Sequence, residues 1–266
     1  MLGLRCISQS NYFTKMLLTT NYMNNIIIPL PTFSSSPKSI HPNRKLSISA
    51  THTATFSIES PISGLDDDLV GYVLGKKKAT EVAHLVWKNV VKKGDTVIDA
   101  TCGNGYDTVA MLKMVADESF QGRVYSLDIQ RDALESASLL LDENVTPEEK
   151  QLVNLVSICH SRMEEIVPKD SPIRLVAFNL GYLPGGDKAM TTLSETTVLA
   201  LEAAKRILLP GGLISLVVYV GHLGGREELE SVENFASELP VDEWICSKFQ
   251  MLNRPVAPVL VFLFKR

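Results

Sequence analysis

The chain has 266 residues, of which 45% are hydrophobic and 21% are charged, and its net charge is −4. This length and apolar content allow one large domain or two small ones around a sizeable core. No stretch reaches about 18 consecutive apolar residues, so we expect no membrane-spanning helix. The cysteines are too widely spaced for a metal knuckle or a disulfide framework, and no metal site is expected. They are Cys6, Cys102, Cys159 and Cys246.

The first 58 residues differ in composition from the rest. They contain five basic residues and no acidic one, and they are rich in Ser, Thr and Pro. Such a segment is typical of an organellar transit peptide, and the scarcity of Arg favours the chloroplast over the mitochondrion. The alternative is a disordered tail that carries no targeting signal. A secretory signal peptide is disfavoured because the segment has no compact apolar core. We therefore predict a disordered transit peptide over 1–58 and a single domain over 59–266.

The charge left after removal of this segment bears on nucleic-acid binding. Because the first 58 residues hold five of the 26 basic residues and none of the 30 acidic ones, the rest has a net charge near −9. Proteins that bind nucleic acid by bulk attraction are basic, so RNA binding would need a local patch. Two lysine clusters could supply it, and ordinary solvated lysines are the alternative. The clusters are Lys76, Lys77, Lys78 and Lys88, Lys92, Lys93.

From about Gly64 onward, short apolar runs alternate with amphipathic stretches, which predicts an α/β sheet covered by helices. Pro210-Gly211-Gly212 is expected to end a helix that Ser194 caps. The last two strands are close enough to form an antiparallel hairpin, so the prediction is a seven-stranded, mostly parallel sheet. Helices are expected over 78–91, 107–115, 132–142, 194–208 and 226–239. Strands are expected over 96–100, 124–127, 153–158, 175–179, 213–219, 244–251 and 257–264.

The strongest motif is a glycine-rich turn between the first strand and a helix. Asp99 ends the strand, and Gly103-Asn104-Gly105 precedes the helix. Glycines allow a sharp turn and a close approach to a ligand, and a helix N-terminus offers free amides. Asp128 closes the second strand, where a carboxylate can accept both hydroxyls of a ribose. A glycine pair alone is compatible with a plain turn, but this set predicts an adenosine-containing cofactor at the carboxyl edge of the sheet.

The spacing also bears on which cofactor is bound. A dinucleotide fingerprint requires a third glycine three residues after Gly105, where this chain has Thr108, so NAD is disfavoured. S-adenosylmethionine has no phosphates, and its ammonium and sulfonium groups suit Asp99 and Asp107. We expect S-adenosylmethionine, with His160 contacting the adenine unless it is an ordinary surface histidine. The expected cofactor contacts are Asp99, Thr101, Gly103, Asn104, Gly105, Asp107, Thr108, Asp128, Gln130, His160 and Asn179.

A second motif, Asn179-Leu180-Gly181-Tyr182, ends the fourth strand. It resembles the Asn-Pro-Pro-Tyr type motif of amino-group methyltransferases, without the prolines. In such sites the Asn oxygen and a backbone carbonyl hold the acceptor amine, while the aromatic ring stacks on the base. A loop-capping Asn179 and a packed core Tyr182 are the alternatives.

Four strings, in chain order, resemble a bacterial family labelled "putative rRNA methylase" and understood as tRNA 5-aminomethyl-2-thiouridine methyltransferases. The resemblance covers about Lys78 to Phe264 and implies a Rossmann-like, class I S-adenosylmethionine-dependent methyltransferase. It also implies methyl transfer to the aminomethyl nitrogen of a wobble uridine, in the anticodon stem-loop of tRNA. The strings are Asp99-Ala-Thr-Cys-Gly-Asn-Gly105, Asp128-Ile-Gln130, Asn179-Leu-Gly-Tyr-Leu-Pro-Gly-Gly-Asp187-Lys188 and Tyr219-Val-Gly-His222.

This reaction needs a proton acceptor, because an alkyl amine with a pKa of about 10 is protonated at neutral pH. Asp187 and His222 are the candidates, unless they are a turn residue and a solvent-facing histidine. With Asn179 and Tyr182 they make up the expected catalytic set. A methyltransferase of rRNA or of a small amine, a non-catalytic cofactor- or RNA-binding module, and a homodimer are left open. The expected substrate contacts are Tyr182, Lys188, Tyr219, His222 and Lys78.

Overall fold

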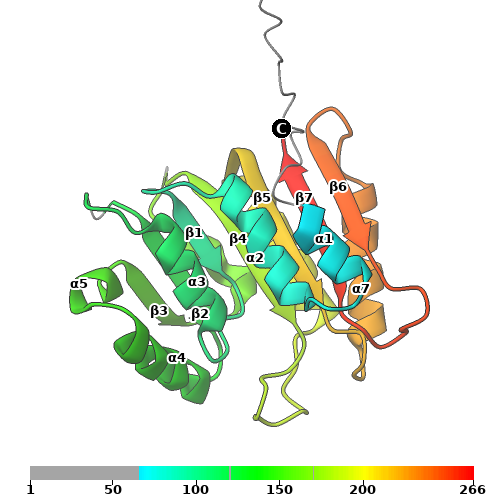
Figure 1. Cartoon of the computed structure of the whole chain (residues 1–266), viewed down its shortest axis with the longest axis horizontal. Coiled ribbons are helices and arrows are strands. Elements are labelled where there is room, and N and C mark those ends of the chain that lie inside the picture. Colours follow the sequence, from blue (N-terminus) through cyan, green and yellow to red (C-terminus); the bar gives the residue numbers. More distant parts are fainter. Residues whose placement is uncertain (1–65, 120, 170) are drawn as a thin grey trace, which may run out of the picture. The chain divides into compact units, whose positions relative to one another are not determined.

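In the computed structural model, the apolar runs form seven strands of one sheet, in the order β3-β2-β1-β4-β5-β7-β6 (Figure 1). The structure describes residues 66–119, 121–169 and 171–266, so the predicted transit peptide lies outside the described residues. The strands are β1 (Thr96–Asp99), β2 (Arg123–Asp128), β3 (Val153–Ser157), β4 (Ile173–Leu180), β5 (Leu208–Val218), β6 (Trp244–Phe249) and β7 (Val259–Lys265).

Strands β1 to β5 run parallel, and β7 pairs antiparallel with both β5 and β6. This is the predicted sheet with its C-terminal antiparallel hairpin. The strand order reverses between β1 and β4, so the loops after these two strands leave the sheet in opposite directions at its carboxyl edge, the position where sheets of this kind bind their ligands. The Ala100 N–H donates to Ala177 O across this point at 2.8 Å. The glycine-rich turn and the loop after β4 therefore share one site.

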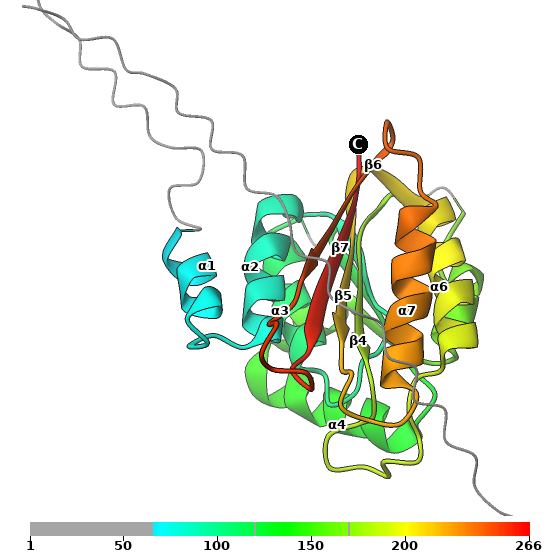
Figure 2. The same ribbon diagram turned by 90° about the vertical axis from the view of Figure 1, so that its right-hand side faces the viewer.

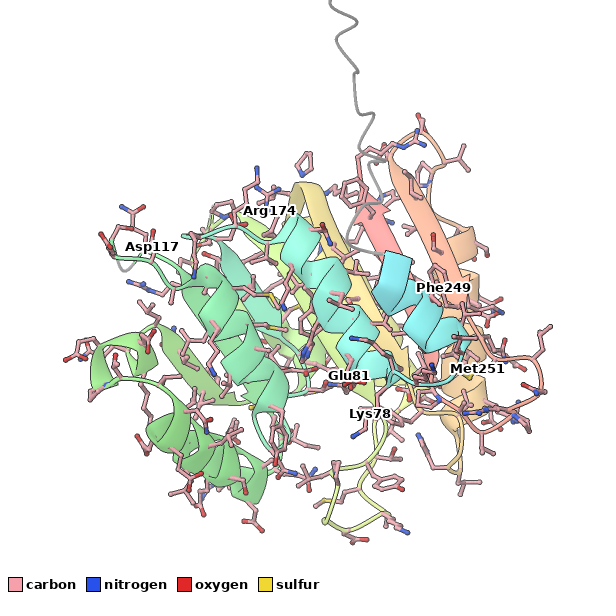
Figure 3. All side chains as sticks on the ribbon, viewed as in Figure 1. Lys78, Glu81, Asp117, Arg174, Phe249 and Met251 are labelled. Carbon is pink, nitrogen blue, oxygen red and sulfur yellow. The ribbon has the colours of Figure 1, made fainter. Side chains whose placement is uncertain are left out.

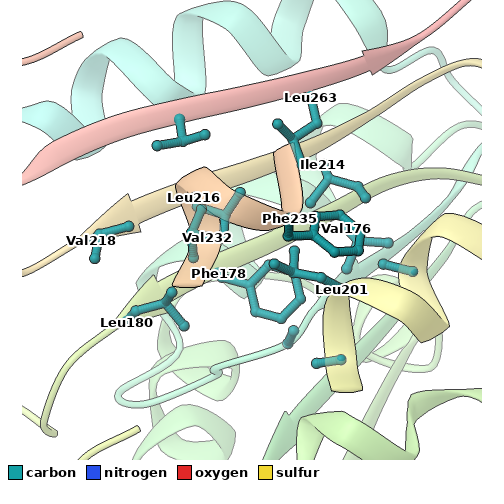
Figure 4. Close-up of a cluster of buried hydrophobic side chains, with 14 of the residues drawn as sticks. Val176, Phe178, Leu180, Leu201, Ile214, Leu216, Val218, Val232, Phe235 and Leu263 are labelled. Atoms are coloured by element: carbon teal, nitrogen blue, oxygen red, sulfur yellow. The ribbon is translucent and has the colours of Figure 1, made fainter. Parts of the chain in front are cut away.

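Helices cover both faces of the sheet. Figure 2 shows α2 and α3 on one side of the strands and α6 and α7 on the other. Both faces are buried, as the alternation along β7 shows: Val261 and Leu263 pack in one core, whereas Leu260 and Phe262 pack in the other. Figure 4 shows the first of these cores, between the sheet, α6 and α7. The helices are α1 (Asp66–Val73), α2 (Ala79–Val90), α3 (Tyr106–Val115), α4 (Arg131–Asn144), α5 (Pro147–Lys150), η1 (His160–Glu165), α6 (Ser194–Ile207) and α7 (Gly225–Ser237).

Three short helices, α1, α5 and η1, were not expected from the sequence. The four-residue α5 replaces the loop expected around Pro147, because Pro147 fits a first helical position and the Glu149 N–H donates to Thr146 Oγ1 at 3.2 Å. None of the helices in the described ranges is long and apolar enough to cross a membrane.

Two predicted boundaries were wrong. Ser194 is the first helical residue of α6, and the N-cap is Leu193, whose side chain makes no capping hydrogen bond. Strand β5 begins at Leu208 and not after the glycine pair, because Leu208 already pairs with Ile173 of β4. The pairing register then shifts, which accommodates Pro210 within the strand.

Candidate active site

The carboxylate of Asp128, at the end of β2, is fixed by two backbone amides. The Gly103 N–H of the glycine-rich turn donates to Oδ2 at 2.9 Å, and the Gln130 N–H donates to Oδ1 at 2.9 Å. Each carboxylate oxygen can accept more than one hydrogen bond, so both keep acceptor capacity. The side chain is therefore held rigidly at the carboxyl edge while it remains able to bind hydroxyl groups.

Gly105 brings the turn close to its neighbouring helix. Its φ is 86°, in the left-handed region that favours glycine. A Cβ placed there would lie 2.7 Å from the Cβ of Ala137 on α4. No other residue type fits this position without moving α4. Gly105 is also the N-cap of α3, so the helix begins directly after the turn.

Asp99 lies behind the turn in a buried polar cluster and is only 1% exposed. Thr108 Oγ1 lies 2.6 Å from Asp99 Oδ2 and 2.9 Å from Ser126 Oγ. Burial raises the pKa of Asp99 to about 7, and repulsion from Asp107 acts in the same direction, against the hydrogen bond from Thr108. A cation bound at this edge would therefore stabilise the ionised form of Asp99.

Asp107, in the first turn of α3, connects three parts of the site. His84 Nε2 of α2 lies 2.6 Å from Oδ1, and Asn179 Nδ2 of β4 donates to Oδ2 at 2.6 Å. The Asn179 N–H donates to Thr101 Oγ1 at 2.7 Å. Because a carboxylate only accepts, the NH₂ group of Asn179 must face Asp107, which turns the amide oxygen away. Within the described residues, that buried oxygen has no hydrogen-bond partner.

The loop after β4, residues 181–193, is called the acceptor loop below. Its base is closed by an antiparallel bridge between Tyr182 and Thr191. It also contacts the glycine-rich turn, since Asn104 Nδ2 donates to Pro184 O at 3.2 Å. Figure 1 shows this long loop below the ends of β4 and β5, on the same edge as the turn. The two sequence motifs thus come together.

The predicted substrate-contacting side chains gather beside this loop. The rings of Tyr182 and His222 are 6.0 Å apart and edge to face, and Lys188 Nζ lies 5.8 Å from the centre of the Tyr182 ring. Tyr182 and Tyr219 are 37% and 38% exposed. Burial raises the pKa of Tyr219, and the nearby Asp107 carboxylate adds to this shift. Tyr182 is therefore a surface aromatic and not the packed core residue that was the alternative.

The two candidate proton acceptors differ in their surroundings. His222 Nδ1 lies 2.8 Å from Leu223 O, a contact that requires the proton on Nδ1 and leaves a lone pair on Nε2. Nε2 is buried without a partner in the described part of the chain, and a Cβ at Gly225 would lie 3.0 Å from it. Asp187 is exposed, and its Oδ1 accepts the Ala189 N–H at 2.9 Å. Asp187 thus stabilises a turn of the acceptor loop.

His160 lies in η1, where its side chain is 7% exposed. Nε2 lies 3.3 Å from Thr196 Oγ1 of α6, and the ring packs edge to face against Phe178. Burial lowers the pKa of His160 to about 4. The histidine is a buried residue of the α6 side and not a surface one, and its contact with the cofactor stays a prediction.

The structure separates the two lysine clusters. The Lys78 N–H donates to Glu81 Oε2 at the start of α2, and Figure 3 shows both residues beside the carboxyl-edge loops. Lys93 Nζ instead donates to two carbonyls at the end of α3, at 2.9 Å and 2.6 Å, and the Lys92 N–H donates to Asp95 Oδ2 just before β1. Lys92 and Lys93 therefore lie at the opposite edge of the sheet, away from the site.

The donors and acceptors at the carboxyl edge fit S-adenosylmethionine. The fixed carboxylate of Asp128 suits ribose hydroxyls, and the glycine-rich turn precedes the N-terminus of α3 at the carboxyl edge, where nucleotide cofactors bind in sheets of this kind. Asp99 and Asp107 supply negative charge for a ligand with two cationic groups. No group of three or more His, Cys, Asp or Glu residues in the described ranges could hold a metal ion.

Sequence reasoning missed two polar side chains here. His84, the partner of Asp107, lies 23 positions before it on another helix. Glu228 is buried on α7, where its neighbours Glu227 and Glu230 are exposed, so the run resembles an ordinary solvated face. Neither has a local sequence signal, because each partner is distant in the chain.

The chain is similar in sequence to known methyltransferases. Residues 124–265 match the family model "Putative rRNA methylase". The chain is 66% identical over 216 residues to a chloroplastic tRNA (mnm(5)s(2)U34)-methyltransferase of Arabidopsis thaliana, which covers 80% of this chain and 79% of that protein.

Two solved structures extend the similarity to the fold. A crystal structure from Clostridium thermocellum, described with the same family words, is 36% identical, with a TM-score of 0.66 over 71% of this chain and 98% of that one. A "putative methyltransferase" of Streptococcus mutans, solved with SAH, is 32% identical, with a TM-score of 0.62 over 71% and 99%. The fold is that of the class I S-adenosylmethionine-dependent methyltransferases. The chain belongs to the family described as "Putative rRNA methylase".

Proposed function

We propose that the protein is an S-adenosylmethionine-dependent N-methyltransferase of tRNA. It converts 5-aminomethyl(-2-thio)uridine at the wobble position to 5-methylaminomethyl(-2-thio)uridine. One observation supports an amine as the methyl acceptor. Asn179 Oδ1 is buried and has no hydrogen-bond partner among the described residues, whereas the NH₂ group of the same amide donates to Asp107. A free amide oxygen at the end of β4 accepts an N–H, and the substrate amine supplies one.

Different residues bind the cofactor, orient the amine and stack on the uracil ring. When bound, the cofactor supplies a methyl group on a sulfonium, and Asp128 with the glycine-rich turn holds the nucleoside part. Asn179 accepts a hydrogen bond from the amine and fixes its approach, while Tyr182 stacks on the uracil ring. Thr101 and Asp107 keep Asn179 in place through the two hydrogen bonds described above. Most of the rate gain then comes from alignment of the amine with the methyl carbon.

The proton of the amine requires an acceptor, and the surroundings favour His222 over Asp187. Nε2 of His222 is unpartnered in the described residues, and the imidazole ring packs edge to face with the Tyr182 ring. The Asp187 carboxylate already binds a loop amide. Histidine is also the side chain that most often acts as a general base.

Three features support tRNA as the substrate. The name of the Arabidopsis relative specifies U34 of tRNA, and the chain is 66% identical to that protein over 216 residues. Lys78 and Lys188 lie at the carboxyl edge, where they provide the local positive charge that an acidic protein needs. Exposed Tyr182 and Tyr219 offer stacking surfaces for unpaired bases. The bound part of the tRNA is its anticodon stem-loop, where the wobble nucleotide lies.

The protein acts in an organelle, and we propose the chloroplast. The relative is named as chloroplastic, and the first 58 residues have the composition of a transit peptide. The proposed parts are a transit peptide over 1–58 and one methyltransferase domain over 59–266. A fluorescent fusion to residues 1–58 is expected to reach chloroplasts, and mitochondrial import would contradict the assignment.

A transfer assay tests the function. Purified protein is incubated with S-adenosylmethionine and tRNA that carries 5-aminomethyl-2-thiouridine, with the same tRNA bearing plain uridine as control, and nucleosides are analysed by mass spectrometry. We expect a methylaminomethyl product only with the first tRNA. Methyl transfer to rRNA fragments or to free amines instead would contradict the proposal, and the absence of any transfer would favour a non-catalytic binding module.

A further inference from the structure

Glu228, in the first turns of α7, is a buried carboxylate that the proposed reaction does not use. It is 1% exposed, and each of its oxygens accepts a hydroxyl from a different segment. Thr197 Oγ1 of α6 lies 2.6 Å from Oε1, and Thr192 Oγ1 of the acceptor loop lies 2.8 Å from Oε2. One side chain thus connects two helices and the loop that carries the proposed acceptor site.

The surroundings of this carboxylate are polar but contain little positive charge. The pKa of Glu228 is raised, because the effect of burial is larger than that of the groups that lower it. Those groups are the hydroxyls of Thr197 and Thr192 and the nearby imidazole of His222. Thr197 is itself fully buried. Without Glu228 its hydroxyl would lose its partner, at a cost that an apolar replacement could not recover. The side chain therefore has a specific hydrogen-bonding role at this junction.

Thr192 connects Glu228 to the base of the acceptor loop. The Thr192 N–H donates to Gly181 O at 3.0 Å, and its neighbour Thr191 forms the bridge with Tyr182. The loop base is thus closed on itself, and the Thr192 hydroxyl attaches this closed base to α7. Tyr182 projects from the same base, with its ring 6.0 Å from that of His222.

We propose, on the basis of the proposed function, that Glu228 is a positioning residue for the acceptor nucleotide. Through Thr192 it holds the base of the acceptor loop, so that Tyr182 and Lys188 meet the wobble base in one orientation. Its other hydrogen bond, to Thr197, serves the packing of α6 against α7. The two bonds of one carboxylate therefore have separable effects, one on substrate use and one on stability.

Thr192→Val and Thr197→Val form a matched pair, because each removes one hydroxyl from the same carboxylate with little change in shape. We expect both to lower the melting temperature, but only Thr192→Val to lower kcat/KM for tRNA, by about tenfold. The dissociation constant for S-adenosylmethionine should stay unchanged in both. Equal losses of kcat/KM in the two variants would overturn the positioning role, as would no loss in either.

Two substitutions of Glu228 itself complete the test. Glu228→Gln keeps an acceptor for Thr197 and gives Thr192 a donor, so kcat/KM should stay within about threefold of wild type, whereas Glu228→Leu should match Thr192→Val. In the Glu228→Leu background, Thr192→Val should not lower kcat/KM any further, because the hydrogen bond that it removes is already absent. Additive losses, or equal losses in the Gln and Leu variants, would overturn the proposal. If Glu228→Leu does not fold, the threonine pair still decides.

The wild-type protein is measured in every series, which separates two kinds of failure. A wild-type protein that leaves the aminomethyl tRNA unmethylated would refute the proposed function. A wild-type protein that methylates this tRNA, with threonine variants that behave alike, would refute only the positioning role of Glu228.

Discussion

The two halves of the site are built differently. The cofactor half consists of the glycine-rich turn and the ends of β1 and β2, where Asp99 is 1% exposed and Asp128 is fixed by two backbone amides. The acceptor half consists of the acceptor loop and the segment 219–224 after β5, where Tyr182 and Tyr219 are more than a third exposed. Backbone amides hold the Asp128 carboxylate of the first half, whereas a side chain of α7, Glu228, attaches the loop of the second half.

This difference matches the ligands. A small cofactor of fixed shape is bound by a rigid, largely buried frame that needs no rearrangement. A tRNA is far larger than the site, so its half must be open and must present stacking and charged groups at the surface. The Asn179–Asp107 hydrogen bond joins the halves, because it connects the end of β4 to the start of α3. Substitutions on either side should therefore have distinct and separable effects.

The largest effect is expected from Asp128→Ala. It removes the acceptor for the ribose hydroxyls and the partner of two amides, so calorimetry should detect no binding of S-adenosylmethionine. The exposed Asp132→Ala on α4 is the matched control and should bind normally. Undiminished affinity in Asp128→Ala would mean that the end of β2 does not belong to the cofactor half.

Asn179→Ala tests the junction of the halves. The amine loses the acceptor that orients it, so the single-turnover rate should fall by about 100-fold. The affinity for S-adenosylmethionine, measured by calorimetry, should change only slightly, because Asp128 and the turn remain. A parallel loss of cofactor affinity and rate would place Asn179 in the cofactor half alone.

His222→Ala and Asp187→Asn compare the candidate proton acceptors within the acceptor half. We expect His222→Ala to lower the single-turnover rate by about 10- to 100-fold, because the amine loses the group that takes its proton. Asp187→Asn should behave like wild type, because an amide oxygen can still accept the Ala189 N–H. If neither variant slows the chemical step, solvent or another group takes the proton.

Two buried titratable residues, Asp99 and His160, should contribute to the pH dependence of stability with opposite signs. The pKa of Asp99 rises from 3.8 to about 7 on folding, so its contribution to the free energy of unfolding is full below pH 3.8 and is lost as the pH rises to about 7. The pKa of His160, beneath α6, falls from 6.5 to about 4, so its contribution is present above pH 6.5 and is lost as the pH falls to about 4.

Denaturant unfolding of the ligand-free protein at pH 5 and pH 8 measures both contributions. Relative to wild type, Asp99→Asn should be more stable at pH 8 than at pH 5, whereas His160→Gln should lose more stability at pH 8 than at pH 5. Parallel changes in the two variants would contradict the assigned directions of the pKa shifts.

The smallest effect is expected from single lysines. Lys78→Ala should weaken tRNA binding a few-fold and reduce the slope of log affinity against log salt by about one, as expected for one lost phosphate contact. Lys92→Ala, at the opposite edge of the sheet, is the control and should change neither. Equal effects would mean that the RNA covers more of the protein than the carboxyl edge.

The sequence predicted the two halves unequally. Asp99 and Asp128 are the last residues of their strands, and Gly105 follows a few positions after Asp99. Their places in the site are set by this short spacing and by the order of the strands, both of which can be read from the sequence. His84 and Glu228 were missed, because their partners Asp107 and Thr192 become neighbours only after the helices pack on the sheet. The start of β5 was placed too late, since pairing with Ile173 overrides the turn tendency of Pro210 and its glycines.

The most direct measurement is the nucleoside profile of organellar tRNA from the source organism after deletion of the gene for this protein. Mass spectrometry should show loss of the 5-methylaminomethyl form at the wobble position and accumulation of the 5-aminomethyl form. Restoration by the wild-type gene but not by Asn179→Ala would connect this change to the amide at the end of β4. An unchanged wobble nucleoside profile would contradict the proposed function.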